Sequence, residues 1–435
     1  MKKTLLSIVM GFGLVGTAAA ENLLQVYQQA LQNDPATLQS QANKDVAYAG
    51  ITQNQARLLP QIELALDASR TNGDTHRNTN DITVRFSQSV WDYSNWKNLD
   101  RAELQASQAD ANYGFAKQDL IVRTVTAYFN VLQAQDDLEF AKAEKRAIER
   151  QLEQTKQRFE VGLTAITDVH EAQAQFDTAV ASEISAQNNV EITLEALREI
   201  TGNYHPDIDV LNTQTFSASM PAPSDINAWV SQAEDRNLQL LASKLSVDIA
   251  KEDIEIAKNG HYPTVALRGQ YNSNDTEGQS SDASISESTD RFDTSYIELG
   301  VTIPLYQGGG VSAAVDSARY SFVATSEERE RIYRSVVRSV RSNYFDVTAA
   351  ISRIKALNQA VVSAESALKA TEAGFEVGTR TIVDVLQSTR NLYDAKRNLA
   401  GARYGYITSI LSLKQAAGTL SEQDVADINS GLTQS

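Results

Sequence analysis

The sequence contains no cysteine, only seven prolines and four histidines, and no long apolar run after its first residues. The absence of cysteine excludes disulfides, thiolate metal sites, a cysteine nucleophile and a lipid-carrying N-terminal cysteine. A membrane-spanning helix needs about 20 consecutive apolar residues, and no later segment provides them. The prolines lie at positions 35, 60, 206, 221, 223, 263 and 304. They leave about 100 residues after Trp96, and everything after Pro304, free of helix breakers.

The histidines and glycines do not indicate an enzyme. His76, His170, His205 and His261 are scattered and match no metal-ligand spacing such as HExxH. The glycine-rich segment 306–310 follows an expected strand, but it lacks the spacing of a phosphate-binding loop. We interpret it as the passage from a strand into a helix. The sequence therefore predicts no enzyme, no cofactor and no metal centre.

The N-terminus has the pattern of a signal peptide at residues 1–20. Lys2 and Lys3 precede an apolar run at 5–15, and small residues at 18–20 precede Glu21. Cleavage there changes the formal net charge from −16 to −18, since two lysines are removed. Such an acidic chain is a poor partner for nucleic acid or anionic lipid surfaces. The exported chain is expected to end either soluble or as a β-barrel.

An internal repeat sets the architecture. The segment at 159–169, FEVGLTAITDV, recurs at 375–385 as FEVGTRTIVDV, with seven of eleven positions identical at an offset of 216. The same offset places Tyr128 on Tyr344 and Leu197 on Leu413. One constant shift indicates two copies of one unit. We assign repeat 1 to 21–225 and repeat 2 to 226–435, the latter with a C-terminal tail.

Long helices are expected at about 97–202 and about 311–418. In both copies mostly apolar residues recur at heptad positions, from Leu138 to Phe159 and from Ile354 to Phe375, which is typical of helices packed along their length. A helix from Trp96 to Phe159 would be about 90 Å long. Val-Gly pairs at 161–162 and 377–378 are expected to end one helix and turn into the next.

Four amphipathic strands are expected before these helices, at about 60–70, 81–91, 262–272 and 295–306. Each alternates apolar with polar or small residues over about 10 positions, the length of a tilted membrane strand. The polar segments 70–80 and 272–295 are expected to be loops. Aromatic residues gather at the strand ends, as in an interfacial girdle: Trp91, Tyr93, Trp96, Tyr262, Tyr296 and Tyr306.

Four strands cannot close a membrane barrel, because the smallest such barrels have about 8 and open edges leave backbone groups unsatisfied in lipid. The chain must therefore oligomerise, and the strand number alone leaves two or three copies open. A soluble four-stranded sandwich would not explain the aromatic residues. A periplasmic coiled-coil adaptor or scaffold without a pore would lack the strands, and in a lone porin strands would occupy more of the chain.

Several segments resemble those of the TolC family of outer-membrane efflux proteins. They are ENLLQVYQQA, YFNVL, QRFEVGLTAITDV, ITGNYHP, IPLYQGG, FEVGTRTIVDVL and AGTLSEQD. The resemblance extends over nearly the whole mature chain. It implies an α+β membrane protein, a homotrimer whose twelve-stranded outer-membrane β-barrel is continuous with a long α-helical barrel in the periplasm.

The resemblance also implies a function and partners. It indicates a passive exit duct of tripartite multidrug efflux and type I protein secretion systems, gated at its periplasmic end. Such a duct works with a periplasmic membrane-fusion adaptor and an inner-membrane RND or ABC transporter.

The same resemblance implies links that hold the periplasmic mouth closed. By motif, Thr167 and Asp168 are expected to face Arg380 and position 375. An arginine on a carboxylate or hydroxyl makes a directional, breakable link. This chain has Phe375 where the family commonly has tyrosine, so a hydroxyl hydrogen bond is lost there.

Asp384 and Gln387 occupy the positions of the family's pore constriction. Three copies of Asp384 would form a ring that binds and selects cations. Gln387 stands where the family has a second carboxylate. The alternative for Asp384 is a solvated charge on a helix.

The helix-to-helix turns are candidates for contact with the adaptor. The residues are Gly162, Leu163, Thr164, Gly378 and Thr379. The alternative is that the glycines only supply the turn, and both roles are compatible.

Overall fold

The computed structural model describes residues 21–72, 75–280 and 288–434, so the expected signal peptide lies outside the described residues. The chain divides into two units, and each takes segments from both sequence repeats. Of the described residues, unit 1 holds 21–35, Lys117–Ser231 and 339–434; unit 2 holds those within Ala36–Ala116 and Gln232–Arg338. Two long helices contribute to both units, α3 (Tyr93–Glu160) and α7 (Gly310–Glu376).

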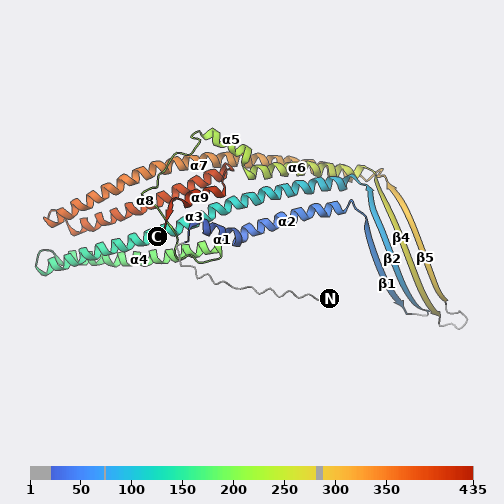
Figure 1. The fold of residues 1–435 in the computed structure, drawn as a ribbon, viewed down its shortest axis with the longest axis horizontal. Helices are drawn as coiled ribbons and strands as arrows, with labels where there is room; N and C mark the ends of the chain where they lie inside the picture. Colours follow the sequence, from blue (N-terminus) through green and yellow to red (C-terminus); the bar gives the residue numbers. More distant parts are fainter. Residues whose placement is uncertain (1–20, 73–74, 281–287, 435) are drawn as a thin grey trace, which may run out of the picture. The chain divides into compact units, whose positions relative to one another are not determined.

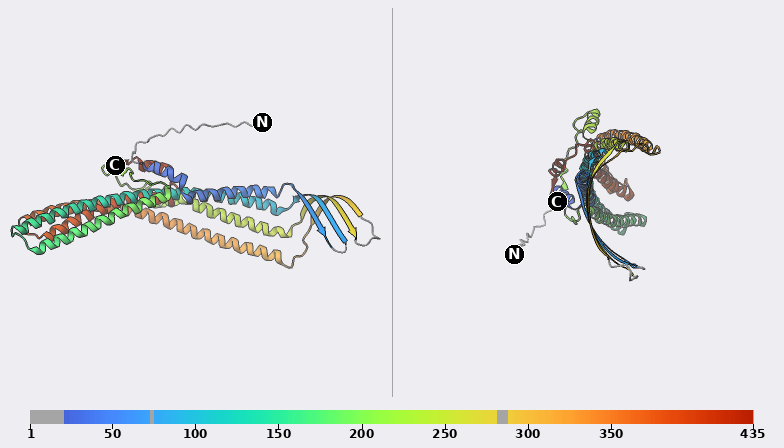
Figure 2. Two further views of the ribbon diagram at one scale, coloured as in Figure 1. Left: turned by 90° about the horizontal axis from the view of Figure 1, so that it is seen from below. Right: turned by 90° about the vertical axis from the view of Figure 1, so that its right-hand side faces the viewer.

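Unit 2 contains a curved antiparallel sheet with the strand order β1-β2-β4-β5 (Figures 1 and 2). Its strands are β1 (Gln61–Thr71), β2 (Thr75–Trp91), β4 (Thr264–Ser280) and β5 (Ser288–Thr302). The register places Ile62, Phe86, Gly269 and Ile297 in one row across the sheet. Residues alternate between faces along a strand, so this row lies on one face and the neighbouring row with Glu63 and Arg85 lies on the other.

The structure corrects the expected loops. Most of 70–80 and 272–295 is strand, because β2 begins at Thr75, β4 continues to Ser280 and β5 begins at Ser288. Backbone hydrogen bonds hold these polar residues in the ladder, and composition alone does not show where pairing stops. Only residues 281–287 of the second segment lie outside the described residues. β5 ends at Thr302, earlier than expected, since the nearby Pro304 has no N–H for the ladder.

Four shorter helices precede the strands of the two repeats, and the heptad pattern did not predict them. They are α1 (Leu23–Asn33), α2 (Pro35–Ala56), α5 (Ile226–Arg236) and α6 (Leu238–Lys258). In unit 2, Arg101 of α3 pairs with Asp253 of α6 at 2.9 Å, and Gln108 donates to the Ser246 hydroxyl at 2.6 Å. No helix in the described part of the chain is long and apolar enough to cross a membrane.

Unit 1 has buried apolar residues on α1, α3, α4 (Ile166–Thr201), α8 (Ile382–Ala416) and α9 (Glu422–Asn429), and α1 packs against α4 and α9. A short sheet of β3 (Val210–Leu211) and β6 (Leu432–Thr433) ties the chain's last residues to its middle. Phe129 is 1% exposed and stacks on Tyr404 with ring centroids 5.4 Å apart. The buried Tyr128 hydroxyl donates to the carbonyl of Asp209 at 2.7 Å.

The repeat supplies a matched pair of variants that tests this core. Phe345 occupies the position of Phe129 in the second repeat but is 63% exposed. Phe129→Ala is expected to lower the free energy of unfolding by about 3–5 kcal/mol through loss of buried area and a cavity. In the monomeric chain, Phe345→Ala should lower it far less, because this ring adds little to the core of one chain. Urea unfolding followed by circular dichroism measures both, and equal losses would contradict this assignment of the core.

Candidate functional site: the helix turns and the groove between the hairpins

Both helix-to-helix turns in unit 1 have the same backbone geometry. After α3, the N–H of Leu163 donates to the carbonyl of Arg158 at 2.8 Å, and that of Gly162 to Phe159 at 2.9 Å. This pair of bonds is a Schellman motif, which needs a residue in the left-handed conformation. Gly162 has φ +75°, and Gly378 takes the same place after α7 with φ +77°. The two Val-Gly pairs therefore end the helices, as predicted from the sequence.

The tips of the turns expose apolar side chains. Val161, Leu163 and Val377 are 70%, 68% and 75% exposed. Of the other expected adaptor contacts, Thr379 is exposed and Thr164 is half-buried. Apolar side chains this exposed add nothing to the core of one chain, so they are available to a partner.

The helices that follow the turns begin differently. The N-cap of α4 is Ala165, which makes no side-chain cap bond, and Asp168 instead accepts a hydrogen bond from the Thr164 hydroxyl. The N-cap of α8 is Thr381, which forms a reciprocal capping box with Asp384. The N–H of Thr381 donates to Asp384 Oδ2 at 2.9 Å, and the N–H of Asp384 donates to Thr381 Oγ1 at 3.3 Å.

Asp384 is therefore a helix-capping residue in its own chain, and its charge is favoured. The backbone hydrogen bond from Thr381 lowers the pKa of the Asp384 carboxyl, assisted by the Thr381 side chain and by the charge of Arg380. Both hydrogen bonds from Thr381 fall on Oδ2. Among the described residues no hydrogen bond is made to Oδ1, so one oxygen of an ionised carboxylate remains available for a ligand.

The residues expected to link the mouth are not joined to one another within one chain. Thr167 and Arg380 are exposed, while Asp168 and Phe375 are half-buried. In the described part of the chain, no hydrogen bond or ion pair connects either of the first-repeat residues to Arg380 or Phe375. The links remain predictions, and the structure shows that Asp168 already has a partner, the Thr164 hydroxyl.

Arg158 and Gly374, which were not predicted from the sequence, contact the two expected mouth residues of the second repeat, Phe375 and Arg380. The guanidinium of Arg158 lies 4.7 Å from the centre of the Phe375 ring, a cation–π contact between the ends of α3 and α7. The Arg380 side chain lies across Gly374, where an added Cβ would be 2.8 Å from Arg380 Cγ. A comparison of the two repeats could have identified these residues. Position 158 holds arginine where its equivalent, position 374, holds glycine, and position 164 holds threonine where its equivalent, position 380, holds arginine.

An apolar cluster near the turns holds the helix ends together. It joins α3, α4 and the start of α8, and its fully buried members are Ile148, Leu152, Ala172, Ala179, Ile382, Val385 and Leu386. Phe176, Leu368 and Phe375 pack against it. Asp384 lies between two cluster residues of α8, on the side of the helix that the cluster leaves open.

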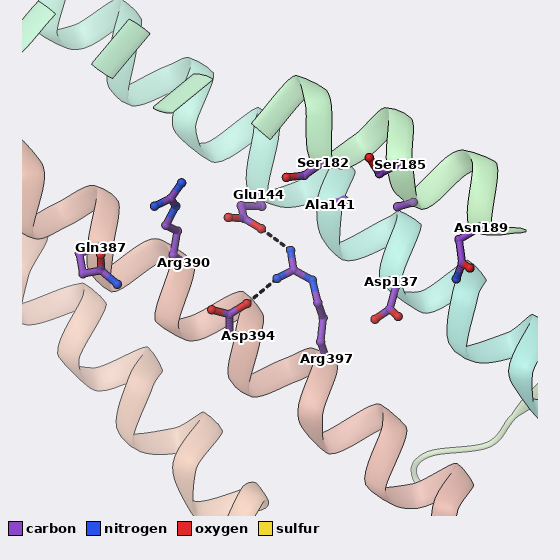
Figure 3. A pocket seen from close by; sticks show the side chains of 11 residues that line it. Asp137, Ala141, Glu144, Ser182, Ser185, Asn189, Gln387, Arg390, Asp394 and Arg397 are labelled. Atoms are coloured by element: carbon purple, nitrogen blue, oxygen red, sulfur yellow. Dashed lines mark hydrogen bonds and ion pairs between the residues drawn. The ribbon is translucent and has the colours of Figure 1, made fainter. Parts of the chain in front are cut away.

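A polar cavity of about 570 Å³ lies in unit 1 between α3, α4 and α8 (Figure 3). Its lining is Asp137, Ala141, Glu144, Ser182, Ser185, Ala186, Asn189, Gln387, Arg390, Asp394 and Arg397. Arg397 donates to Asp394 at 2.6 Å and also to Glu144, across from α8 to α3. Gln387, the expected constriction residue, is exposed, lines the cavity and donates to Asn391 at 2.9 Å. Gln387 therefore lies at the edge of this cavity, which is a groove with charged walls.

Two neighbouring carboxyls of α3 are held in surroundings that disfavour their charge. Burial raises the pKa of Asp136, and the hydrogen bond from the Tyr404 hydroxyl, 2.6 Å away, lowers it in part. Burial also raises the pKa of Asp137, while the charge of Arg397 acts in the opposite direction. The described residues contain no cluster of three or more His, Asp or Glu that could hold a metal ion.

The fold is that of an outer-membrane channel protein. It matches the crystal structure of the Campylobacter jejuni CmeC outer membrane channel with a TM-score of 0.77, over 100% of this chain and 98% of that one. The two sequences are only 15% identical in this alignment, so the similarity concerns the fold.

The sequence comparisons identify the family. Residues 26–203 and 229–419 match the profile of the outer membrane efflux proteins, and the chain belongs to this family. It is 47% identical to the outer membrane protein TolC of Vibrio cholerae, over 99% of both chains. It is 44% identical to TolC of Escherichia coli K12, over 99% of this chain and 90% of that one. The chain is thus an outer-membrane exit duct for efflux, and the resemblance stated from its motifs is confirmed.

The packing of Arg380 on Gly374 leads to a prediction about the second turn. Gly374→Ala would place its Cβ 2.8 Å from the middle of the Arg380 side chain and 3.2 Å from Thr379 Oγ1, so the turn must shift. We expect a loss of about 1–3 kcal/mol of stability and faster trypsin cleavage after Arg380, measured by mass spectrometry. Gly405→Ala is the control, since nothing lies within 4 Å of the added methyl group. Equal cleavage rates in both variants would refute the packing role of Gly374.

The raised pKa of Asp136 predicts a pH-dependent stability. The ordinary pKa of this carboxyl is 3.8, and in the folded chain the carboxyl ionises only at a higher pH. Above that raised pKa the folded chain carries a charge in unfavourable surroundings, which lowers its stability. Asp136→Asn is expected to raise the melting temperature at pH 7.5, and the gain should vanish as the pH falls below 3.8. Tyr404→Phe removes the hydrogen bond that favours the charge, so its loss of stability should grow with pH. Thermal unfolding at several pH values measures both, and a pH-independent effect of Asp136→Asn would count against the assignment.

Proposed function

We propose that three copies of this exit duct assemble, and that their sheets close into a twelve-stranded barrel in the outer membrane. The observation that carries the proposal is the apolar face of the sheet. Leu64 and Leu66 of β1 are 61% and 67% exposed, and Ile297 and Leu299 of β5 are 85% and 64% exposed. An exposed apolar band made of alternate strand residues is what a lipid-facing barrel wall requires.

The sheet edges support the same proposal. Within the described residues, β1 pairs only with β2, and β5 pairs only with β4. The outer edge of each would leave its backbone groups without hydrogen bonds in lipid, which costs several kcal/mol for each group. Pairing β5 of one copy with β1 of the next removes both edges. Three is the number of copies that the family resemblance implies.

A periplasmic adaptor or scaffold without a pore is the alternative, and the sheet argues against it. A soluble scaffold would have to cover the apolar face with other residues of the chain, because a patch of this size in water promotes association. The β1 residues that face away from Leu64 are polar or small, with Glu63 opposite Arg85, as suits the wall of an aqueous channel.

The duct is proposed to be passive and to serve both multidrug efflux and type I secretion. Its partners would be a periplasmic membrane-fusion adaptor and an inner-membrane RND or ABC transporter. The exposed Val161, Leu163 and Val377 at the turns offer the adaptor an apolar contact. Gly162, Thr164, Gly378 and Thr379 belong to the same proposed contact, and the glycines also supply the turns.

The periplasmic mouth is proposed to close through the residues near the turns. Thr167, Asp168 and Arg380 would form links when three copies come together, and Phe375 contributes its contact with Arg158 in place of a hydroxyl bond. The three Asp384 carboxylates would form a cation-binding constriction. Their lowered pKa and available Oδ1 oxygens support this role, and Gln387 adds no second ring of charge.

Planar bilayer recordings of the purified protein test the duct and its constriction. The wild type is expected to insert channels that divalent cations block weakly. Asp384→Asn should reduce the block because the ring loses its charge, whereas Gln387→Asp should strengthen it by adding a second ring.

The control for lost helix capping is Thr381→Ala, which removes the N-cap side chain of the capping box but retains the Asp384 charge, and it should retain the block. Unchanged block in Asp384→Asn would sink the proposed ring. A homogeneous oligomer that inserts no channels would overturn the proposed barrel itself.

A further inference from the structure

The helices of unit 1 near the turns form two hairpins. The first hairpin is α4 with the part of α3 from residue 117, and the second is α8 with the part of α7 from residue 339. Each hairpin has an internal ion pair. Lys145 of α3 pairs with Glu183 of α4 at 2.6 Å, and Lys396 of α8 pairs with Glu365 of α7 at 3.3 Å. Movement of one hairpin against the other leaves these pairs intact.

One ion pair joins the two hairpins across the groove. The Arg397 guanidinium on α8 donates to the Glu144 carboxylate on α3 (Figure 3). Their side chains are 25% and 12% exposed, so water screens this pair less than the exposed pairs on the helix surfaces. The other guanidinium nitrogen donates to Asp394 of α8, one turn earlier on the same helix.

The Arg397–Glu144 pair can open without stranding a charge in an apolar core. Arg397 keeps its bond to Asp394 when it leaves Glu144, and the charge of Asp137 is also close enough to interact with it. Glu144 would remain at the edge of the polar cavity, where water can reach it. A fully buried pair would resist such a change much more strongly.

The second link between the same helices is better buried. The Tyr404 hydroxyl donates to Asp136 at 2.6 Å, and the Tyr404 ring is 7% exposed and stacks on Phe129. This contact lies about two helical turns further from the helix turn than Arg397. It provides a fixed point about which the turn end of the second hairpin can move.

The sequence repeat shows that the ion pair is specific to one kind of hairpin contact. The offset of 216 places Ala360 at the position of Glu144 and Ala181 at the position of Arg397. In the proposed trimer, α3 and α8 meet within a chain, and the equivalent contact is α7 with α4 of the next copy. That contact between copies has alanines where the contact within a chain has charges.

We propose that the Arg397–Glu144 pair is a latch that holds the second hairpin against the first hairpin of its own chain, and that the mouth widens when it opens. The proposal rests on the duct proposed above and adds a regulatory contact away from the turns. It assigns a function to residues on the wall of the groove, beside the expected constriction residue Gln387.

Charge-neutral variants test the latch in planar bilayers. Glu144→Gln and Arg397→Gln are each expected to raise the ratio of time spent in the higher to the lower conductance level about tenfold, which corresponds to about 1.4 kcal/mol. The double exchange Glu144→Arg with Arg397→Glu should restore the wild-type ratio. A purely structural role would lower thermal stability without changing this ratio.

The matched control is Arg146→Gln. Arg146 pairs with Glu139 at 3.3 Å on the surface of α3 alone, with side chains 57% and 66% exposed. This variant removes an arginine charge from α3, the helix that carries Glu144, but should leave the conductance ratio unchanged. If Glu144→Gln and Arg397→Gln form channels with the same conductance ratio as the wild type, the latch is refuted, whereas the proposed duct is not.

A second measurement does not depend on channel formation. The chain has no cysteine, so Ala141→Cys places a single thiol in the lining of the groove at a position that is only 3% exposed. Maleimide should label this thiol faster when Glu144→Gln is also present, because the hairpins separate more often. Equal labelling rates would overturn the latch even if the protein forms no channel.

Discussion

The constraint on which the rest of the structure depends is that one chain cannot satisfy its own sheet. Four strands leave the outer edges of β1 and β5 without partners among the described residues, and one face is apolar and exposed. Backbone groups in lipid need hydrogen bonds, so in the proposed barrel other copies continue the sheet. In that proposal the same assembly also brings together the helices α3 and α7, which begin shortly after β2 and β5.

The two hairpins show how a duplicated sequence acquires unequal ends. Both turns keep the Schellman glycine, because only a residue at positive φ can reverse the chain there. The neighbouring positions have diverged: Ala165 leaves α4 without a side-chain cap, whereas Thr381 and Asp384 cap α8 reciprocally. The ion pair of Glu144 with Arg397 likewise has no counterpart at the equivalent positions of the repeat, which are Ala360 and Ala181. The two hairpins therefore make different side-chain contacts, although the backbone geometry of their turns is the same.

Much of the fold could be predicted from local patterns. Alternation located four strands, the repeat offset located both turns, and family motifs identified an outer-membrane efflux protein. The strand ends were wrong at 70–80 and 272–295, because polar residues in a ladder look like loop residues in a sequence. The short helices α1, α2, α5 and α6 were missed, since they lack the heptad seam of the long helices.

The sequence by itself determined the long helices, the glycines that turn them and the candidate charges near the mouth. These features depend on neighbours a few residues away, through periodicity, proline placement and the need for positive φ. Only the tertiary structure decided which charges meet: Arg397 with Glu144, Tyr404 with Asp136, and Arg158 with the Phe375 ring. The physical reason is that side-chain pairs depend on the rotation of each helix about its axis. That rotation is set by packing over the whole unit, and no local pattern contains it.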